Sequence, residues 1–243
     1  IFVAAECEPW AKTGGLGDVV DALARALGRV PGVLDEPVEV FLPRYRSVPV
    51  PEGRRLREGR VAVAGAGARG GIADVVVRSL AASGYRLRLV DHPPAFDRDG
   101  LYGDSGGEFP DNARRFAVLA RAALETRRAE GRPVDVIALH DWHACSAAML
   151  RDLVYPSDPA VGRAAITLTL HNLAYHGWTP RDRVAQLGLG DDPPVALDDQ
   201  QRLRDLLVGG EALATALAFT SSPDAFTGGA RIHHAGIGLA TIR

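Results

Sequence analysis

Strand-like apolar runs and helix-like segments alternate along most of this chain. Several of the runs are almost continuously apolar, as strands covered on both faces are. The strands are predicted at 1–6, 38–42, 72–78, 85–91, 134–139, 165–170 and 216–221, and the helices at 15–29, 110–130, 143–153 and 202–214. This order predicts an α/β fold, a doubly wound and mostly parallel Rossmann-like sheet with helices on both faces.

The segment 59–90 departs from that alternation. Three apolar runs, VAVAGA, GIADVVVRS and YRLRLVD, follow one another with only short Gly- and Ser-containing breaks. Strands that follow each other so closely cannot be joined by crossover helices. We therefore expect a local antiparallel hairpin or meander here.

Composition excludes several classes of partner. The 243 residues carry 28 basic and 30 acidic side chains, so no overall positive field exists to hold nucleic acid or an anionic membrane surface. No apolar run approaches the roughly 18 residues that a membrane span needs. Two cysteines, Cys7 and Cys145, are too few for a disulfide framework. These features predict a cytoplasmic protein.

A glycine-rich turn that carries a lysine follows the first predicted strand. In AKTGGLGD, Gly14, Gly15 and Gly17 allow close backbone approach and lead into a helix whose N-terminus favours an anion. Lys12 adds a point charge suited to phosphate. The spacing does not match the P-loop or the classical dinucleotide fingerprint, and a glycine turn alone also has purely steric explanations.

Polar side chains also follow two later strands. The run at 134–139 ends in HDWH, where burying His140, Asp141 and His143 is costly unless they are paired or used. Zinc binding is the lesser interpretation, because no Cys or Glu cluster stands beside them, so no metal is expected. Asp141 could instead cap the helix that begins near His143.

The run at 165–170 ends in HNLAYHGW, which combines hydrogen-bonding groups with aromatic rings. His171 and Asn172 can bind hydroxyl groups, and Tyr175 can stack on a sugar face. A satisfied core histidine is the plain alternative for a single case, but three such strand ends in one chain weaken it. A further polar loop holds Tyr102 and precedes a helix that Asp111 or Asn112 could begin.

Together these segments resemble the bacterial glycogen synthase and plant starch synthase family. The resemblance rests on AAECEPWAKTGGLGDVVDAL, LPRYRSV, FDRDGLYGD, FPDNARRFAVLARAALE, HDWHA and TLHNLAYHGW, which occur in family order. It implies retaining transfer of glucose from ADP-glucose, or UDP-glucose, to the non-reducing end of an α-1,4-glucan. It also implies no cofactor, because the nucleotide sugar is a substrate.

The resemblance implies a role for each matching residue. Lys12 would contact the phosphates of the sugar nucleotide, His171 would lie at the transferred glucose, and Asp141 would line the acceptor side. These three are the expected catalytic residues. The expected substrate-binding residues are Lys12, Gly14, Gly15, Asp18, Tyr102, His143 and Asn172.

The resemblance also predicts the domain organisation. Residues 1–230 would form the N-terminal, acceptor-side catalytic domain and residues 231–243 the start of a linker. The nucleotide-binding C-terminal domain of the family would then be missing, and the isolated chain is expected to be inactive. Two alternatives stay open: another two-domain nucleotide-sugar transferase, and a non-catalytic glucan-binding module.

Overall fold

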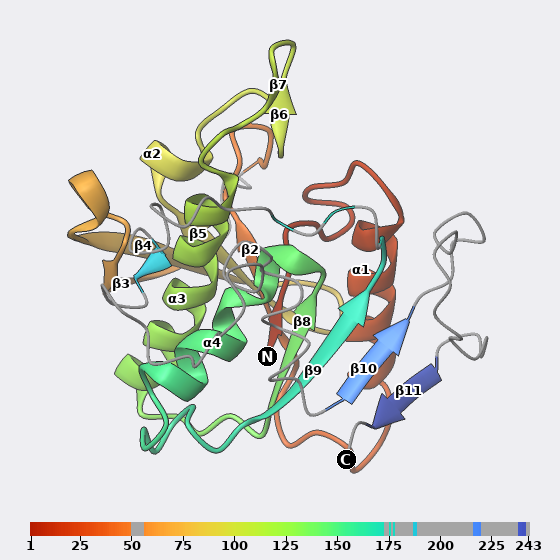
Figure 1. Cartoon of the computed structure of the whole chain (residues 1–243). Helices are drawn as coiled ribbons and strands as arrows, with labels where there is room; N and C mark the ends of the chain where they lie inside the picture. Colours follow the sequence, from red (N-terminus) through yellow and green to blue (C-terminus); the bar gives the residue numbers. More distant parts are fainter. Residues whose placement is uncertain are drawn as a thin grey trace.

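One nine-stranded sheet forms the centre of the molecule (Figure 1). The computed structural model describes residues 1–49, 56–172, 175, 177 and 187–188, together with strands at 216–219 and 238–241. The strand order is β11-β10-β9-β8-β1-β2-β5-β4-β3. The strands are β1 (Phe2–Val3), β2 (Glu39–Pro43), β3 (Arg57–Ala64), β4 (Ile72–Ala81), β5 (Arg86–Asp91), β8 (Val136–His140), β9 (Ala165–Leu170), β10 (Ala216–Phe219) and β11 (Gly238–Thr241).

The central strands are parallel, as the alternation predicts. Each neighbouring pair from β10 through β9, β8, β1 and β2 to β5 runs in the same direction. The pairs β3–β4 and β4–β5 are antiparallel, which confirms the meander expected in 59–90. Two further short strands, β6 (Gly103–Asp104) and β7 (Gly107–Glu108), form a separate hairpin.

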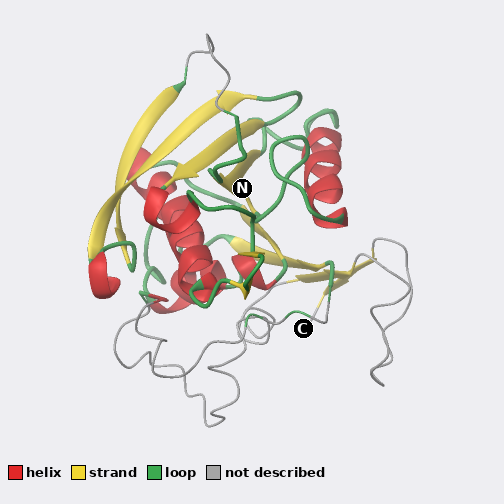
Figure 2. Cartoon of the chain, turned by 90° about the horizontal axis from the view of Figure 1, so that it is seen from above, coloured by secondary structure: helices red, strands yellow, loops and turns green. Residues whose placement is uncertain are grey.

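Helices cover both faces of the sheet (Figure 2). Helix α1 (Gly15–Leu27) lies on one face, and α3 (Asn112–Glu130) and α4 (Ser146–Leu153) pack together on the other. Three short helical turns are α2 (Pro93–Phe96), η1 (Ala68–Gly70) and η2 (Trp142–Ala144). The doubly wound α/β prediction is therefore confirmed, while the helix predicted at 202–214 lies outside the described residues.

Apolar spacing explains how α1 packs on the sheet. Leu16, Val20 and Ala24 recur every four residues and are all buried, so they form one stripe against the core. The opposite face of the helix carries charged and exposed residues. This packing presses the N-terminus of α1, and the glycine loop before it, against the end of β1.

Strand register brings the site residues to one edge of the sheet. His140, the last residue of β8, pairs with Thr169 of β9, and the N–H of Asp141 donates to the carbonyl of Thr169 at 2.9 Å. Val3 pairs with Leu139, so β1 ends close to the same level. The polar residues that follow these three strands therefore meet at a single edge.

The range 231–243 is expected to begin a linker, and the structure describes residues 238–241 of it. Within it, Gly238–Thr241 forms β11, which pairs antiparallel with β10 at the edge of the sheet. This part of the range thus satisfies its backbone hydrogen bonds within the domain. The domain boundaries stay predictions. No helix in the described part of the chain is long and apolar enough to cross a membrane.

Candidate active site

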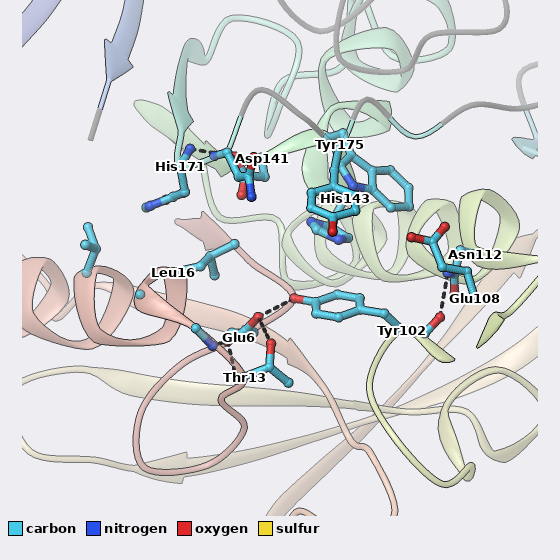
Figure 3. A pocket seen from close by; sticks show the side chains of 15 residues that line it. Glu6, Thr13, Leu16, Tyr102, Glu108, Asn112, Asp141, His143, His171 and Tyr175 are labelled. Atoms are coloured by element: carbon cyan, nitrogen blue, oxygen red, sulfur yellow. Dashed lines mark hydrogen bonds between the residues drawn. The ribbon is translucent and has the colours of Figure 1, made fainter. Parts of the chain in front are cut away.

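A cavity of about 700 Å³ opens where β1, β8 and β9 end (Figure 3). The glycine loop before α1, the loop that holds Tyr102 and the ends of two strands form its walls. It is lined by Glu6, Thr13, Gly14, Gly15, Leu16, Val19, Tyr102, Glu108, Asn112, Asp141, Trp142, His143, His171, Asn172 and Tyr175. Seven of the nine site residues predicted from the sequence lie in this lining. The two that do not are Lys12 and Asp18.

Asp141 joins the ends of β8 and β9 through its carboxylate. One oxygen accepts hydrogen bonds from the backbone N–H of His171 at 2.6 Å and from that of Asn172 at 3.4 Å. Asp141 is the N-cap residue of η2, but its side chain makes no capping hydrogen bond there, because the carboxylate reaches the neighbouring strand end instead. Asp141 also has φ 57° and ψ −178°, a strained conformation for a residue with a side chain.

Burial raises the pKa of Asp141 to about 7, even though the two backbone N–H groups favour its ionised form. The carboxyl group can therefore hold or release a proton near neutral pH. Such a group, placed at the edge of a cavity, can either accept a hydrogen bond from a hydroxyl or donate one.

Glu6 organises the glycine loop and was missed in the sequence. Its buried carboxylate accepts hydrogen bonds from the Thr13 N–H and hydroxyl, both at 2.7 Å, and from the Gly14 N–H at 3.1 Å. It also accepts one from the Tyr102 hydroxyl at 2.6 Å. Figure 3 shows Glu6 between Thr13 and Tyr102. A carboxylate at the end of an apolar strand, just before glycines, was the available signal.

The glycines allow a ligand to approach the loop backbone. A Cβ placed on Gly14 or Gly15 would meet no atom within 4 Å, so both face open space along the cavity wall. The N–H of Gly14 is already bound to Glu6, which leaves less of the loop backbone for an anion than the sequence implied. Gly17 leaves room for the Lys12 side chain, which a Cβ at this position would crowd.

Tyr102 is fixed from both ends. Its hydroxyl donates to Glu6, and its carbonyl accepts from the Asn112 side chain at 2.8 Å. Its ring lies 4.8 Å from that of His143 and 5.9 Å from that of Phe116, measured between centroids. Burial raises the pKa of Tyr102 well above its usual range, so the hydroxyl stays protonated.

The cavity histidines are neutral. Burial lowers the pKa of His143 to about 3 and that of His171 to about 4. His143 is enclosed by the rings of Tyr102, Phe116 and Trp142, and its Nδ1 has no hydrogen-bond partner. Neutral imidazoles act as hydrogen-bond donors and acceptors and do not supply positive charge.

Lys12 lies beside the cavity and forms ion pairs. Its Nζ is 2.6 Å from an Asp18 oxygen and 3.9 Å from a Glu8 oxygen. The hydrogen bond to Asp18 raises the pKa of Lys12. Both Lys12 and Asp18 are partly exposed, so the pair can exchange partners at low cost.

The charge of the lining indicates what it can bind. Within the described part of the chain, the lining contains Glu6, Glu108 and Asp141 but no Lys or Arg. The described residues also bring together no group of three or more His, Cys, Asp or Glu side chains able to hold a metal ion. Carboxylates, neutral imidazoles, amides and aromatic rings suit the hydroxyl groups and faces of a sugar better than a diphosphate.

A mostly parallel α/β domain with a cavity at the carboxyl ends of its strands has the Rossmann-like architecture in which ligands bind at that edge of the sheet. Residues 1–223 match the family model of the starch synthase catalytic domain. The chain belongs to that family, as the sequence motifs predict.

Relatives and a solved structure agree with this assignment. The chain is 40% identical over 194 residues to a glycogen synthase of Bordetella bronchiseptica, covering 78% of this chain and 36% of that protein. It is 39% identical over 199 residues to glycogen synthase 2 of Geobacter metallireducens, covering 79% and 38%. The chain thus spans little more than a third of these relatives.

Among solved structures, the catalytic domain of starch synthase IV from Arabidopsis thaliana, bound to ADP and acarbose, is similar with a TM-score of 0.72. Its sequence is 28% identical, and the match covers 89% of this chain and 43% of that one.

Proposed function

We propose that the natural protein transfers glucose from ADP-glucose to the non-reducing end of an α-1,4-glucan with retention, and that this chain forms the acceptor-side wall of the active site. The proposal is supported by the family match and by the glycogen synthases among the relatives. The ADP and acarbose bound to the starch synthase IV domain agree with a nucleotide-sugar donor and a sugar acceptor.

The observation that carries the proposal is the division of charge between the cavity and Lys12. The cavity gathers Asp141, His143 and His171 with aromatic rings, a set suited to sugar hydroxyls. Lys12 lies just outside that lining, on the loop that Glu6 holds. In our proposal the sugar occupies the cavity, and Lys12 leaves Asp18 to stabilise charge on the departing phosphate.

Glucose incorporation into glycogen by the full-length natural protein tests the proposal. With radiolabelled ADP-glucose and glycogen, we expect incorporation that saturates with both substrates, and less with UDP-glucose. Digestion by a β-amylase, which removes α-1,4-linked units from non-reducing ends, should release the label. Absence of incorporation from both donors would contradict the proposed activity.

A glucan-binding role without catalysis is the second candidate. It is favoured by the absence of Lys and Arg from the described lining, which gives this chain a site for sugar hydroxyls without one for a diphosphate. Binding of maltoheptaose by the full-length protein, combined with no transfer from either donor, would support this role instead.

A further inference from the structure

His140 lies behind the cavity and contacts one of its histidines. It is the last residue of β8, has no exposed surface and does not line the cavity. Its Nδ1 lies 3.0 Å from Nε2 of His171, and the two ring planes are 28° apart. The other ring nitrogen, Nε2 of His140, is buried without a hydrogen-bond partner.

The contact requires that one of the two facing nitrogens carries a proton and the other accepts it. Burial lowers the pKa of both rings, so each holds a single proton near neutral pH. If Nε2 of His171 were the donor, the proton of His140 would lie on its own Nε2 and would be an unpaired, buried N–H. Among backbone groups, a buried N–H without an acceptor is rarer than an under-satisfied buried carbonyl, and the same preference between the two ring nitrogens disfavours this arrangement.

The favoured arrangement therefore places the proton of His140 on Nδ1, from which it is donated to Nε2 of His171. His171, accepting at Nε2, must then carry its own proton on Nδ1. The ring of Phe2, 5.2 Å from that of His140, helps to hold the donor ring in place.

We propose that His140 is a positioning residue that holds His171 as the Nδ1–H tautomer, so that the ring of His171 keeps a fixed orientation in the cavity wall that faces the bound sugar. The sugar in this statement rests on the proposed function, whereas the tautomer does not.

Variants of His140 separate positioning from packing in the full-length protein. His140→Phe keeps a ring beside Phe2 but removes the donor, and we expect kcat to fall about 10- to 100-fold with a smaller change in KM. His140→Asn places an amide N–H near the original Nδ1 and should recover much of that loss. His140→Gln places its amide near the position of Nε2 and should not recover the lost kcat.

His92 gives the matched control. It is also buried, lies outside the cavity lining and bonds the carbonyl of Ala66 through Nε2 at 3.1 Å. His92→Phe should leave kcat and KM unchanged at a temperature where the variant is folded. Equal kcat values for His140→Phe, His92→Phe and the unaltered protein would overturn the inference.

Nitrogen NMR on the unaltered protein, labelled with [15N]histidine, tests the tautomer without an activity assay. We expect His171 to show a protonated Nδ1 and an unprotonated Nε2, and His140 the same pattern. A protonated Nε2 on His171 would overturn the inference even if glucose transfer is normal. If transfer is absent while the expected tautomer is found, the proposed function fails and the positioning role of His140 in the pair stands.

Discussion

Lys12 is the only lysine among the 28 basic side chains of the chain. A chain that uses arginine at every other basic position retains at this one the residue whose charge is compact and mobile. Asp18 and Glu8 hold the ammonium group at the surface, where a bound phosphate can replace them. At the scale of single residues, this composition favours a chemical role for Lys12 over a solvated surface position.

Lys12→Ala in the full-length protein should lower kcat about 100-fold, because the leaving phosphate would lose a charge-stabilising group. Lys12→Arg keeps the charge but crowds the space that Gly17 leaves for the side chain, so we expect partial activity. Arg46→Ala is the control, since Arg46 is exposed and pairs with Asp97 and Asp99 outside the cavity lining. An unchanged rate for Lys12→Ala would assign Lys12 to the solvated surface.

Asp141 should make stability depend on pH in an unusual direction. Its pKa of about 7 exceeds the value of about 4 for an unfolded aspartate, so the folded state retains a proton that the unfolded state releases between these values. Its contribution to stability is therefore lost as pH rises from about 4 to 7. Because Asn does not titrate, the free energy of unfolding of Asp141→Asn should rise relative to that of the unaltered protein by up to about 1.4 kcal/mol per pH unit across that window.

Asp158 provides a control of opposite sign. Burial acts to raise its pKa, but hydrogen bonds from Arg128 and two backbone N–H groups outweigh burial and lower it. Asp158→Asn should therefore be less stable than the unaltered protein at neutral pH, with the difference shrinking as pH falls through the lowered pKa. Urea unfolding measures both variants, at pH 5, 6, 7 and 8 for Asp141→Asn and down to about pH 3 for Asp158→Asn. If the free energies of unfolding of Asp141→Asn and the unaltered protein differed by the same amount at every pH, the raised pKa of Asp141 would be contradicted.

At the scale of elements, α3 holds two loops through two adjacent arginines. Arg115 is buried and donates to the carbonyls of Ala95 and Leu101, at 2.5 and 3.2 Å, which fixes the chain on the approach to Tyr102. Arg114 donates to the carbonyls of Gly65, Ala66 and Gly67 in the loop between β3 and β4. Arg115 thus supports the loop that lines the cavity, whereas its neighbour Arg114 supports the β3–β4 loop, which lies outside the cavity lining.

Arg115→Met should loosen the loop around 97–111 and weaken substrate binding, because the carbonyls of Ala95 and Leu101 lose a charged donor worth roughly 1.5–3 kcal/mol for each hydrogen bond. Arg114→Met removes a comparable set of contacts and should loosen only the β3–β4 loop. Hydrogen exchange by mass spectrometry measures both loops, and kcat/KM measures the cavity. Equal losses of kcat/KM in the two variants would show that the effect is general destabilisation.

At the scale of the whole molecule, local patterns predicted much of the architecture. Continuous apolar runs located the strands, and helical spacing located α1, α3 and α4. Strand ends followed by polar residues indicated Asp141 and His171, and both line the cavity, because parallel strands end at one edge of the sheet. Contacts between residues far apart in the sequence could not be predicted in this way. Glu6 looked like the end of a strand, and its hydrogen bond with Tyr102 joins residues 96 positions apart. The ion pair of Lys12 with Asp18 spans only six residues, but it was also missed, because it depends on how the glycine loop bends.

The charge distribution of the whole chain leads to a prediction about this chain expressed by itself. Its cavity offers carboxylates and neutral polar groups, with Lys12 as the nearby cation. Transfer from ADP-glucose requires charge stabilisation on a diphosphate, which a single exposed lysine cannot provide in water.

We expect residues 1–243 alone, shown to be folded by circular dichroism, to bind maltoheptaose weakly by calorimetry and to incorporate no measurable glucose. The chain spans 36–38% of two glycogen synthases that it matches, and we expect transfer from ADP-glucose to need a counterpart of the rest of those proteins. Turnover by the 243 residues alone would contradict this division of roles and would require a second positively charged group beside the cavity.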